Sequence, residues 1–198
     1  MCGIFGVIGS PTPSPDLIRR AQNSLSHRGP DMSDSISIPS ITFGHTLLSI
    51  IGEQPTKQPI QSRDGRGLLT FNGEIYNYLE IKSELSDYPY KSETDTEVIL
   101  AAYEKWGDRC VEHFIGMFAF AILDKNKNLL YLARDRSGEK PFYISCGNNF
   151  FSFSSDLISQ KYIPSFDNSI NKLAVEKYLQ FNYIPTPLTI FQHSFKLP

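Results

Sequence analysis

The feature that most limits the fold of this chain is a pair of consecutive β-hairpin patterns in its second half. Two apolar runs, Met117–Leu123 and Leu129–Ala133, flank the polar segment Asp124–Asn128. Two aromatic-rich runs, Phe142–Ser145 and Phe150–Phe153, then flank a Gly-Asn-Asn segment. Short runs of this kind on either side of turn residues are typical of hairpins. Because hairpins join neighbouring strands in an antiparallel sense, this half predicts antiparallel sheet.

The first half of the chain is also mostly β in pattern. Apolar and β-branched runs predict strands at Cys2–Ile8, 36–38, 41–45 and 68–71. Between the first two, the apolar positions of Asp16–Leu25 recur with helical spacing. A strand therefore begins at the very N-terminus.

Helices are predicted in the middle of the chain and near its end. The middle ones are Tyr76–Leu85 and Thr96–Trp106, and the second has capping-box spacing from Thr94 and a closing Gly107. A last helix, 170–179, leads into a Pro-rich tail with no visible element after it. Strands at both ends and helices between them predict an α+β domain with helical layers over antiparallel sheets.

Composition favours an ordinary soluble globular protein. Apolar residues make up 40% of the 198 residues and charged residues 20%, with a net charge of −2. Acids and bases are interspersed, so neither a nucleic-acid partner nor a membrane partner is expected. No apolar run is long enough to cross a bilayer, and no signal peptide is visible. With three cysteines and no export signal, we expect reduced thiols and a cytoplasmic protein.

Cys2 is the first candidate for chemistry. Removal of Met1 would leave a residue that carries both a thiol and a free α-amine. The reference pKa values, about 8.5 and about 7.7 to 8.0, are close enough for the amine to take the thiol proton near neutral pH. The alternative is a small, inert, buried cysteine at the start of a strand, which position alone favours.

Other candidates have an ordinary structural interpretation as well as a functional one. Asn72 and Gly73 could form a simple turn, or a side-chain amide and a backbone N–H that hold an oxyanion. Asp95 could stabilise a helix N-terminus, or accept hydrogen bonds from a substrate ammonium. His27 and His45 have no companion at metal-ligand spacing, so we interpret both as structural and predict no metal site.

Seven ordered motifs, taken together, resemble the glutaminase domain of asparagine synthetase-type class II glutamine amidotransferases. They are Met1–Gly6, His27–Asp31, Gly44–His45, Asn72–Asn77, Asp95–Ile99, Gly116–Phe120 and Ala133–Pro141. The resemblance implies the four-layer αββα fold of N-terminal nucleophile hydrolases, with two antiparallel sheets between helical layers. It also favours the catalytic interpretation of Cys2.

The resemblance implies a role for each matching residue. Cys2 would be the nucleophile, with its α-amine as base, and Asn72 with the Gly73 N–H would stabilise the oxyanion. Glu74 and Asp95 would hold the glutamine ammonium. Residues of one further segment would lie along the substrate, and Arg28 would brace the loop near the nucleophile. That substrate segment comprises Leu47, Leu48, Ser49, Ile50 and Ile51.

One position departs from the family pattern. Leu47 stands where the family usually has an Arg that pairs with the glutamine α-carboxylate, so a charge-assisted contact is missing. Gly52 also replaces a usual Asp. Arg63 and Arg66 are the nearby bases that could supply the lost charge. We therefore expect weak glutamine binding.

The end of the chain resembles the connection into an ATP-dependent synthetase domain. We expect residues 1–165 to form the glutaminase domain and 166–198 to begin that connection. No pyrophosphate-binding loop is visible, so no cofactor is expected in this chain, and ATP and Mg²⁺ are expected only in a synthetase domain that follows it. That covalently following domain is the expected partner. The sequence does not decide between a monomer and a homodimer.

Three functions remain open at this stage. The favoured one is hydrolysis of glutamine, with the ammonia passed to an asparagine-forming or other amidating synthetase. The second is a non-catalytic structural or regulatory module whose protein takes ammonia from solution, and Leu47 favours it. The third is an acylase or peptidase with the same N-terminal chemistry, which the acids Glu74 and Asp95 disfavour.

Overall fold

Two antiparallel sheets form the body of the protein. The computed structural model describes residues 1–9, 12–49 and 57–198. In sheet A the strands follow the order β10-β8-β9-β1-β3-β2, and in sheet B the order is β4-β5-β6-β7. The strands of sheet A are β1 (Gly3–Gly9), β2 (Met32–Ile38), β3 (Ile41–Leu47), β8 (Tyr143–Cys146), β9 (Phe150–Ser154) and β10 (Ser194–Lys196). Those of sheet B are β4 (Ile60–Gln61), β5 (Gly67–Ile75), β6 (Gly116–Asp124) and β7 (Leu129–Arg134).

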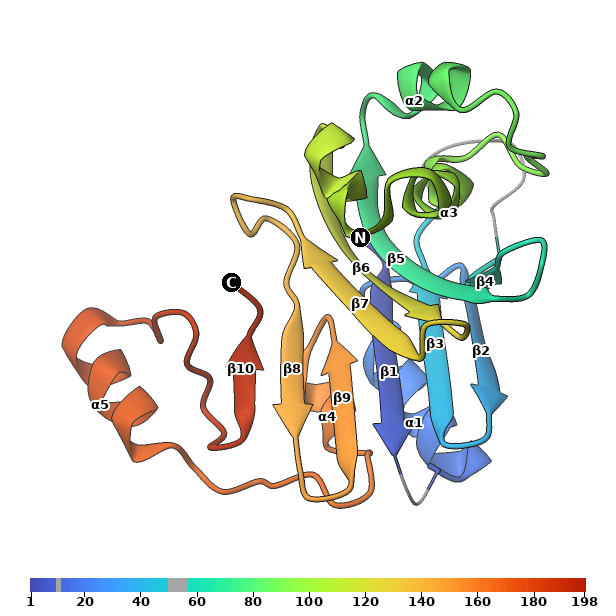
Figure 1. Cartoon of the computed structure of the whole chain (residues 1–198). Coiled ribbons are helices and arrows are strands. Elements are labelled where there is room, and N and C mark those ends of the chain that lie inside the picture. The colour runs from blue at the N-terminus through green and yellow to red at the C-terminus, as the bar shows by residue number, and fades with distance from the viewer. Residues whose placement is uncertain (10–11, 50–56) are drawn as a thin grey trace.

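Helices cover the outer faces of both sheets (Figure 1). They are α1 (Pro15–Ser24), α2 (Tyr78–Glu84), α3 (Asp95–Trp106), the 3-10 helix η1 (Gly107–His113), α4 (Leu157–Gln160) and α5 (Lys172–Phe181). Helices α1 and α4 pack on sheet A, whereas α2 and α3 pack on sheet B. The order helix, sheet, sheet, helix confirms the predicted four-layer α+β fold.

Each interface between layers has its own apolar cluster. Leu25 of the α1 end packs on Phe5 of β1, and Ile99 of α3 packs on Phe120 of β6. Between the sheets lie fully buried side chains from both, including Phe153. Burial of such side chains on the inner faces holds the two sheets together, and the sheet edges stay available for other contacts.

The structure differs from the sequence-based expectation at two strands. Strand β5 continues from Gly67 to Ile75, so Asn72 and Gly73 lie within a strand and the turn interpretation of this pair is wrong. The tail was expected to hold no element, yet β10 pairs with β8. Both differences arise from long-range pairing, which local propensity does not encode.

Helix α3 begins and ends close to the predicted residues, but its N-terminal capping differs from the prediction. Gly107, at φ 63°, ends the helix as expected. The side chain of Thr94 makes no capping hydrogen bond. Glu97 instead accepts the backbone N–H groups of Lys91 and Ser92, at 2.9 and 2.8 Å, and so ties the preceding loop to the helix.

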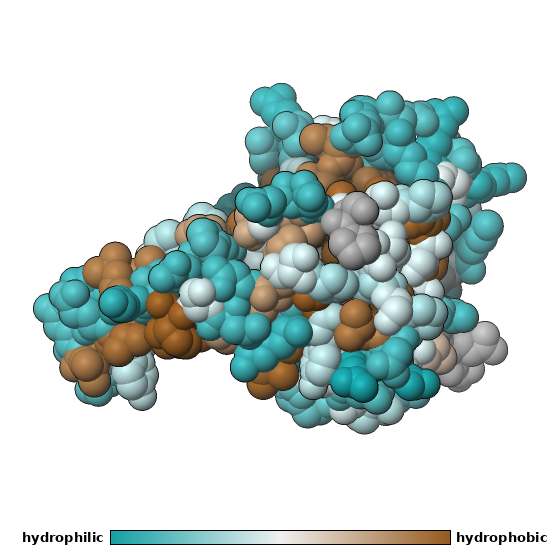
Figure 2. Space-filling model, turned by 90° about the horizontal axis from the view of Figure 1, so that it is seen from below, coloured by the Kyte–Doolittle hydropathy of each residue, from teal (hydrophilic) through white to brown (hydrophobic). Residues whose placement is uncertain are grey.

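The segment around α5 projects from the body of the molecule. Figure 2 shows apolar side chains on this projection, and Leu173, Leu179 and Phe181 of α5 are exposed. Among the described residues, no helix is long and apolar enough to span a membrane.

Candidate active site

Cys2 lies directly before β1 and is held against the end of β3. Its Sγ accepts the Leu48 N–H at 3.4 Å and lies 3.7 Å from the Leu48 carbonyl oxygen. The pairing of Gly3 with Thr46 brings these two segments together. The nucleophile candidate is therefore placed by the sheet itself and is only half-buried.

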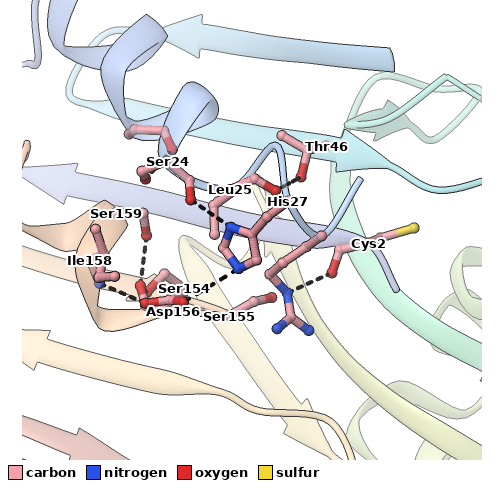
Figure 3. A network of polar contacts seen from close by, with 12 residues as sticks. Cys2, Ser24, Leu25, His27, Thr46, Ser154, Ser155, Asp156, Ile158 and Ser159 are labelled. Atoms are coloured by element: carbon pink, nitrogen blue, oxygen red, sulfur yellow. Dashed lines mark hydrogen bonds and ion pairs between the residues drawn. The ribbon is translucent and has the colours of Figure 1, made fainter. Parts of the chain in front are cut away.

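Arg28 braces the same residue from the opposite side. Its Nε donates to the Cys2 carbonyl oxygen at 3.1 Å. The neighbouring His27 donates from Nδ1 to the Ser24 carbonyl oxygen, 3.0 Å away, and its Nε2 lies 3.8 Å from Asp156 Oδ2. In Figure 3 the Cys2 sulfur points away from this network. Arg28 thus fixes the backbone of Cys2 and leaves the thiol free for another surface, as the resemblance implies.

Asn72 has the most unusual environment in the site. It is 1% exposed, and within the described part of the chain both its side-chain oxygen and its side-chain nitrogen are buried without a hydrogen-bond partner. An unpaired buried polar group costs about 1 to 3 kcal/mol. Such groups call for an explanation. A substrate oxygen that the amide nitrogen could bind is the explanation that the oxyanion-hole assignment provides.

Among the described residues, one backbone N–H of β5 beside that amide has no acceptor. Every second N–H group of β5 points away from β6. Two of these N–H groups donate to side chains. Phe71 N–H donates to Gln58 Oε1 at 2.8 Å, and Ile75 N–H donates to Asp95 Oδ2 at 3.0 Å. Gly73 lies between them on the same edge, opposite Phe118, whose own N–H and carbonyl bond to Asp135.

Glycine is required at position 73 by its backbone and its surroundings. Its φ is +156°, and a Cβ atom there would lie 2.2 Å from the Met117 carbonyl oxygen. No other residue avoids that clash without a shift of the sheet. The pair Asn72-Gly73 therefore offers two donors, one from a side chain and one from the backbone, to the same neighbourhood.

Two carboxyl groups flank this region. Burial, followed by the Asp95 charge, raises the pKa of Glu74 to about 7. Burial also raises the pKa of Asp95 to about 6, although the Ile75 N–H counteracts the rise. Both carboxylates raise the pKa of the Cys2 thiol, so they lie within electrostatic range of the sulfur. An ammonium group bound between these two carboxyl groups would favour their ionised forms, so the pair is a favourable site for one.

The thiol and the N-terminal amine influence each other. Burial raises the pKa of the Cys2 thiol, whereas the Leu48 N–H and the amine lower it. Burial also lowers the pKa of the Met1 amine, against the opposing effect of Cys2. With Met1 removed, the amine belongs to Cys2 itself. Both shifts favour the neutral thiol and the neutral amine, so the amine is unprotonated and available as the base when the thiol attacks.

The predicted substrate segment is described only in part. Ile50 and Ile51 lie outside the described residues. Leu47 is 8% exposed and pairs with Met32, whereas Ser49 donates its N–H to Asp31 at 2.8 Å. Asp31 therefore holds the backbone that would lie along the substrate.

The two bases suggested as substitutes for the missing Arg do not reach the site. Arg63 is exposed, and Arg66 pairs with Asp64 at 3.0 Å just before β5 begins. Gly73 lies six residues along β5 from Gly67, which is about 20 Å at a strand rise of about 3.3 Å per residue. This correction follows from the extension of β5, which separates its two ends.

Several residues that support the site were missed or assigned no role. The side-chain oxygen of Gln58 accepts a hydrogen bond from the Phe71 N–H. His45 Nε2 lies 3.1 Å from the Phe71 carbonyl oxygen and donates to it. His45 was interpreted as structural, which this contact supports. Gln58 carried no local signal, because its partner is brought near only by tertiary pairing. Among the described residues, no group of three or more metal-binding side chains is brought together.

Comparison with known proteins gives consistent matches. The family model described as glutamine amidotransferase domain matches residues 1–198. A putative asparagine synthetase (glutamine-hydrolysing) 2 from Methanocaldococcus jannaschii is 40% identical, covering 100% of this chain and 42% of the relative. Asparagine synthetase (glutamine-hydrolysing) 1 from Bacillus subtilis is 36% identical, covering 98% of this chain and 32% of the relative. The chain thus spans less than half the length of either.

A solved structure supports the fold independently. Glutamine phosphoribosylpyrophosphate amidotransferase from B. subtilis superposes with a TM-score of 0.68 at 18% identity. The match covers 81% of this chain and 43% of that protein. At this identity the likeness concerns the arrangement of layers and strands alone.

Proposed function

Because this chain belongs to the glutamine amidotransferase domain family, we propose that it hydrolyses glutamine to glutamate and ammonia through a thioester on Cys2. The observation that carries the proposal is the buried, unpartnered amide of Asn72 beside Gly73. A non-catalytic module would have no use for this arrangement, which costs stability. The non-catalytic alternative has no such observation in its favour.

The proposed reaction proceeds in two steps. The α-amine of processed Cys2 takes the thiol proton, and the thiolate attacks the side-chain amide carbon of glutamine. The tetrahedral oxyanion is held by Asn72 Nδ2 and Gly73 N–H, and Glu74 and Asp95 hold the substrate ammonium. The amine returns its proton to the leaving nitrogen, which departs as ammonia. Water then attacks the thioester in the same way and releases glutamate.

The fate of the ammonia depends on protein beyond this chain. The relatives named asparagine synthetase are more than twice as long, and we propose that a synthetase domain that follows this one uses the ammonia to amidate a carboxylate. ATP and Mg²⁺ would belong to that domain. Either aspartate or another carboxylate, such as that of a sugar acid, could be the acceptor, and the acceptor would be chosen there.

The proposed nucleophile is tested by replacement of Cys2. In protein freed of Met1, Cys2→Ala should abolish release of glutamate, because no other thiol lies at the site: Cys110 is fully buried and Cys146 lies on β8. Glutamate release is measured with a coupled dehydrogenase assay. Cys146→Ala is the matched control and should keep wild-type activity. Near-normal activity in Cys2→Ala would show that the nucleophile is assigned wrongly.

A further inference from the structure

Beside the candidate site, side chains take the place of a strand along the outer edge of β5. Strand β4 pairs with β5 only at Leu68 and Leu69. Within the described part of the chain, no strand lies on this edge from there to Ile75. Backbone N–H groups at an open sheet edge need other partners. Two of them, those of Phe71 and Ile75, have side-chain partners, and Gly73 lies between these two residues.

Gln58 supplies the first of these side-chain partners. It is 5% exposed and stands two residues before β4 begins. In the β4 register Ile60 faces Leu69, and continuation of that register would set Gln58 opposite Phe71. The side-chain oxygen of Gln58 accepts the Phe71 N–H at 2.8 Å. The Gln58 amide therefore does for β5 at this point what a neighbouring strand would do.

The nitrogen of the same amide reaches helix α3. Gln58 Nε2 donates to Thr96 Oγ1 at 3.4 Å, and Thr96 is 4% exposed. Both polar ends of Gln58 thus have partners in a place that water hardly reaches, as a buried amide requires. One side chain joins strand β5 to the first turn of α3, which lies over sheet B (Figure 1).

This bridge connects the direct neighbours of two proposed site residues. Phe71 precedes Asn72, and Thr96 follows Asp95. Asp95 makes a second link between the same two elements, because its Oδ2 accepts the Ile75 N–H at 3.0 Å. The proposed oxyanion donors lie between the two links along β5. Two links fix both the separation and the angle of strand and helix, whereas the Asp95 link alone would let the strand edge pivot about it.

Resting on the proposed glutaminase function, we propose that Gln58 is a positioning residue that holds the oxyanion donors of β5 at a fixed separation from the Asp95 carboxylate. Glutamine carries its amide and its ammonium on one short carbon chain, so both ends bind well only at one separation of their partners. A displacement of about 1 Å in such an arrangement costs on the order of 100-fold in rate. Gln58 acts on the reaction through Phe71 and Thr96.

The variant Gln58→Met removes both hydrogen bonds and nearly keeps the volume of the side chain. The kcat/KM for glutamine, which spans both ends of the site, should fall about 100-fold. The amide 4-carbamoylbutanoate is glutamine without its α-amino group and does not use the ammonium site. Its kcat/KM, already low in wild type, should fall by only about threefold. Ammonia release measures both reactions. An equal fall for the two amides would show that Gln58 only stabilises β5, and no fall for glutamine would equally overturn the proposal.

Two further variants test the bridge itself. Gln61→Met is the matched control, because Gln61 is an exposed glutamine on β4, and it should keep the wild-type kcat/KM for both amides. Thr96→Val breaks the bridge at its other end with little change of shape and keeps the Phe71 hydrogen bond. It should show the same selective loss for glutamine at a smaller size, and it carries the test alone if circular dichroism shows that Gln58→Met does not fold.

A double variant and the wild type complete the experiment. Gln58→Met with Thr96→Val should cost no more than Gln58→Met alone, because both changes remove one bridge. Losses that multiply would mean that the two side chains act independently, contrary to the proposal. No ammonia release from glutamine by Met1-processed wild type would refute the proposed function, whereas release by wild type with equal losses for both amides in Gln58→Met would refute only the role of Gln58.

Discussion

At the scale of the residue, Asn72 carries the proposed oxyanion site at a cost in stability. Its amide is buried on a strand, where the turn that its sequence favours is replaced by a ladder with β6. In the proposed reaction, the free energy lost by desolvation is recovered when the substrate oxygen binds the amide. The proposal thus makes Asn72 a preorganised donor for the charge that develops on that oxygen.

Asn72→Ala should depress kcat far more than it raises KM. Removal of one oxyanion donor typically costs about 100- to 1000-fold in kcat. Steady-state glutamine hydrolysis at saturating substrate measures the effect. Asn72→Ala should also unfold at a higher temperature than wild type, because the unpaired amide is gone. A variant altered only in KM would contradict the oxyanion assignment.

The proposed mode of glutamine binding places Leu47 at the α-carboxylate end of the substrate. A glutamine α-carboxylate that faces Leu lacks a charge-assisted contact of about 1.5 to 3 kcal/mol, which is roughly ten- to a hundredfold in binding. Leu47→Arg should therefore lower KM for glutamine. Glutaminamide lacks the carboxylate and should gain nothing, which separates an ion pair from repacking of the pocket. Tight glutamine binding by wild type, unimproved by Leu47→Arg, would show that another base already holds the carboxylate.

At the scale of elements, the contact between β3 and β5 aligns the two sheets at the site. His45 of β3 bonds to the Phe71 carbonyl, one residue before Asn72. Burial lowers the pKa of His45 to about 4, so the imidazole is neutral when the protein is active. A protonated His45 would leave a charge between the sheets, where nothing described neutralises it.

The pKa of His45 predicts loss of stability in acid. The unfolded chain binds a proton at about pH 6.5 and the folded chain only near pH 4, so the free energy of unfolding falls as pH falls through that window. The loss is about 3 kcal/mol at pH 4. Urea denaturation at several pH values measures it. His45→Gln keeps a donor without titrating and should flatten the profile relative to wild type. The exposed His193→Gln is the control; equal slopes for all three proteins would contradict this account.

At the scale of the molecule, the C-terminal segment adds a strand to sheet A. The expected domain limit at residue 165 stays a prediction, but β10 covers the edge of β8, and Ser194 Oγ lies 2.6 Å from Ser145 Oγ in the buried interior. Exposed sheet edges promote pairing with other chains. The segment after residue 165 thus completes sheet A.

A chain that ends at Ser165 should be less stable than the 198-residue chain and should self-associate. Loss of β10 exposes the backbone of β8 and removes the partner of Ser145. Differential scanning calorimetry and analytical ultracentrifugation measure both effects. Ser194→Ala in the 198-residue chain removes only the side-chain contact and should stay monomeric at a slightly lower Tm. A truncated chain that is equally stable and monomeric would establish residues 1–165 as an independent unit.

The sequence by itself determined the class of fold and the identity of most site residues. Hairpin patterns predicted antiparallel sheets, because side-chain alternation and turn chemistry are local properties. Cys2 became a candidate because it carries both a thiol and an amine, although its position alone favoured an inert cysteine. The ordered motifs then supplied Asn72, Glu74 and Asp95.

Only the tertiary structure decided how these residues act together. The strand that contains Asn72 and Gly73 extends beyond its local pattern because β6 pairs along its whole length. That pairing buries the Asn72 amide, leaves the Gly73 N–H between two occupied neighbours, and removes Arg66 from the site. Burial and register join residues distant in sequence, and no local pattern contains that information.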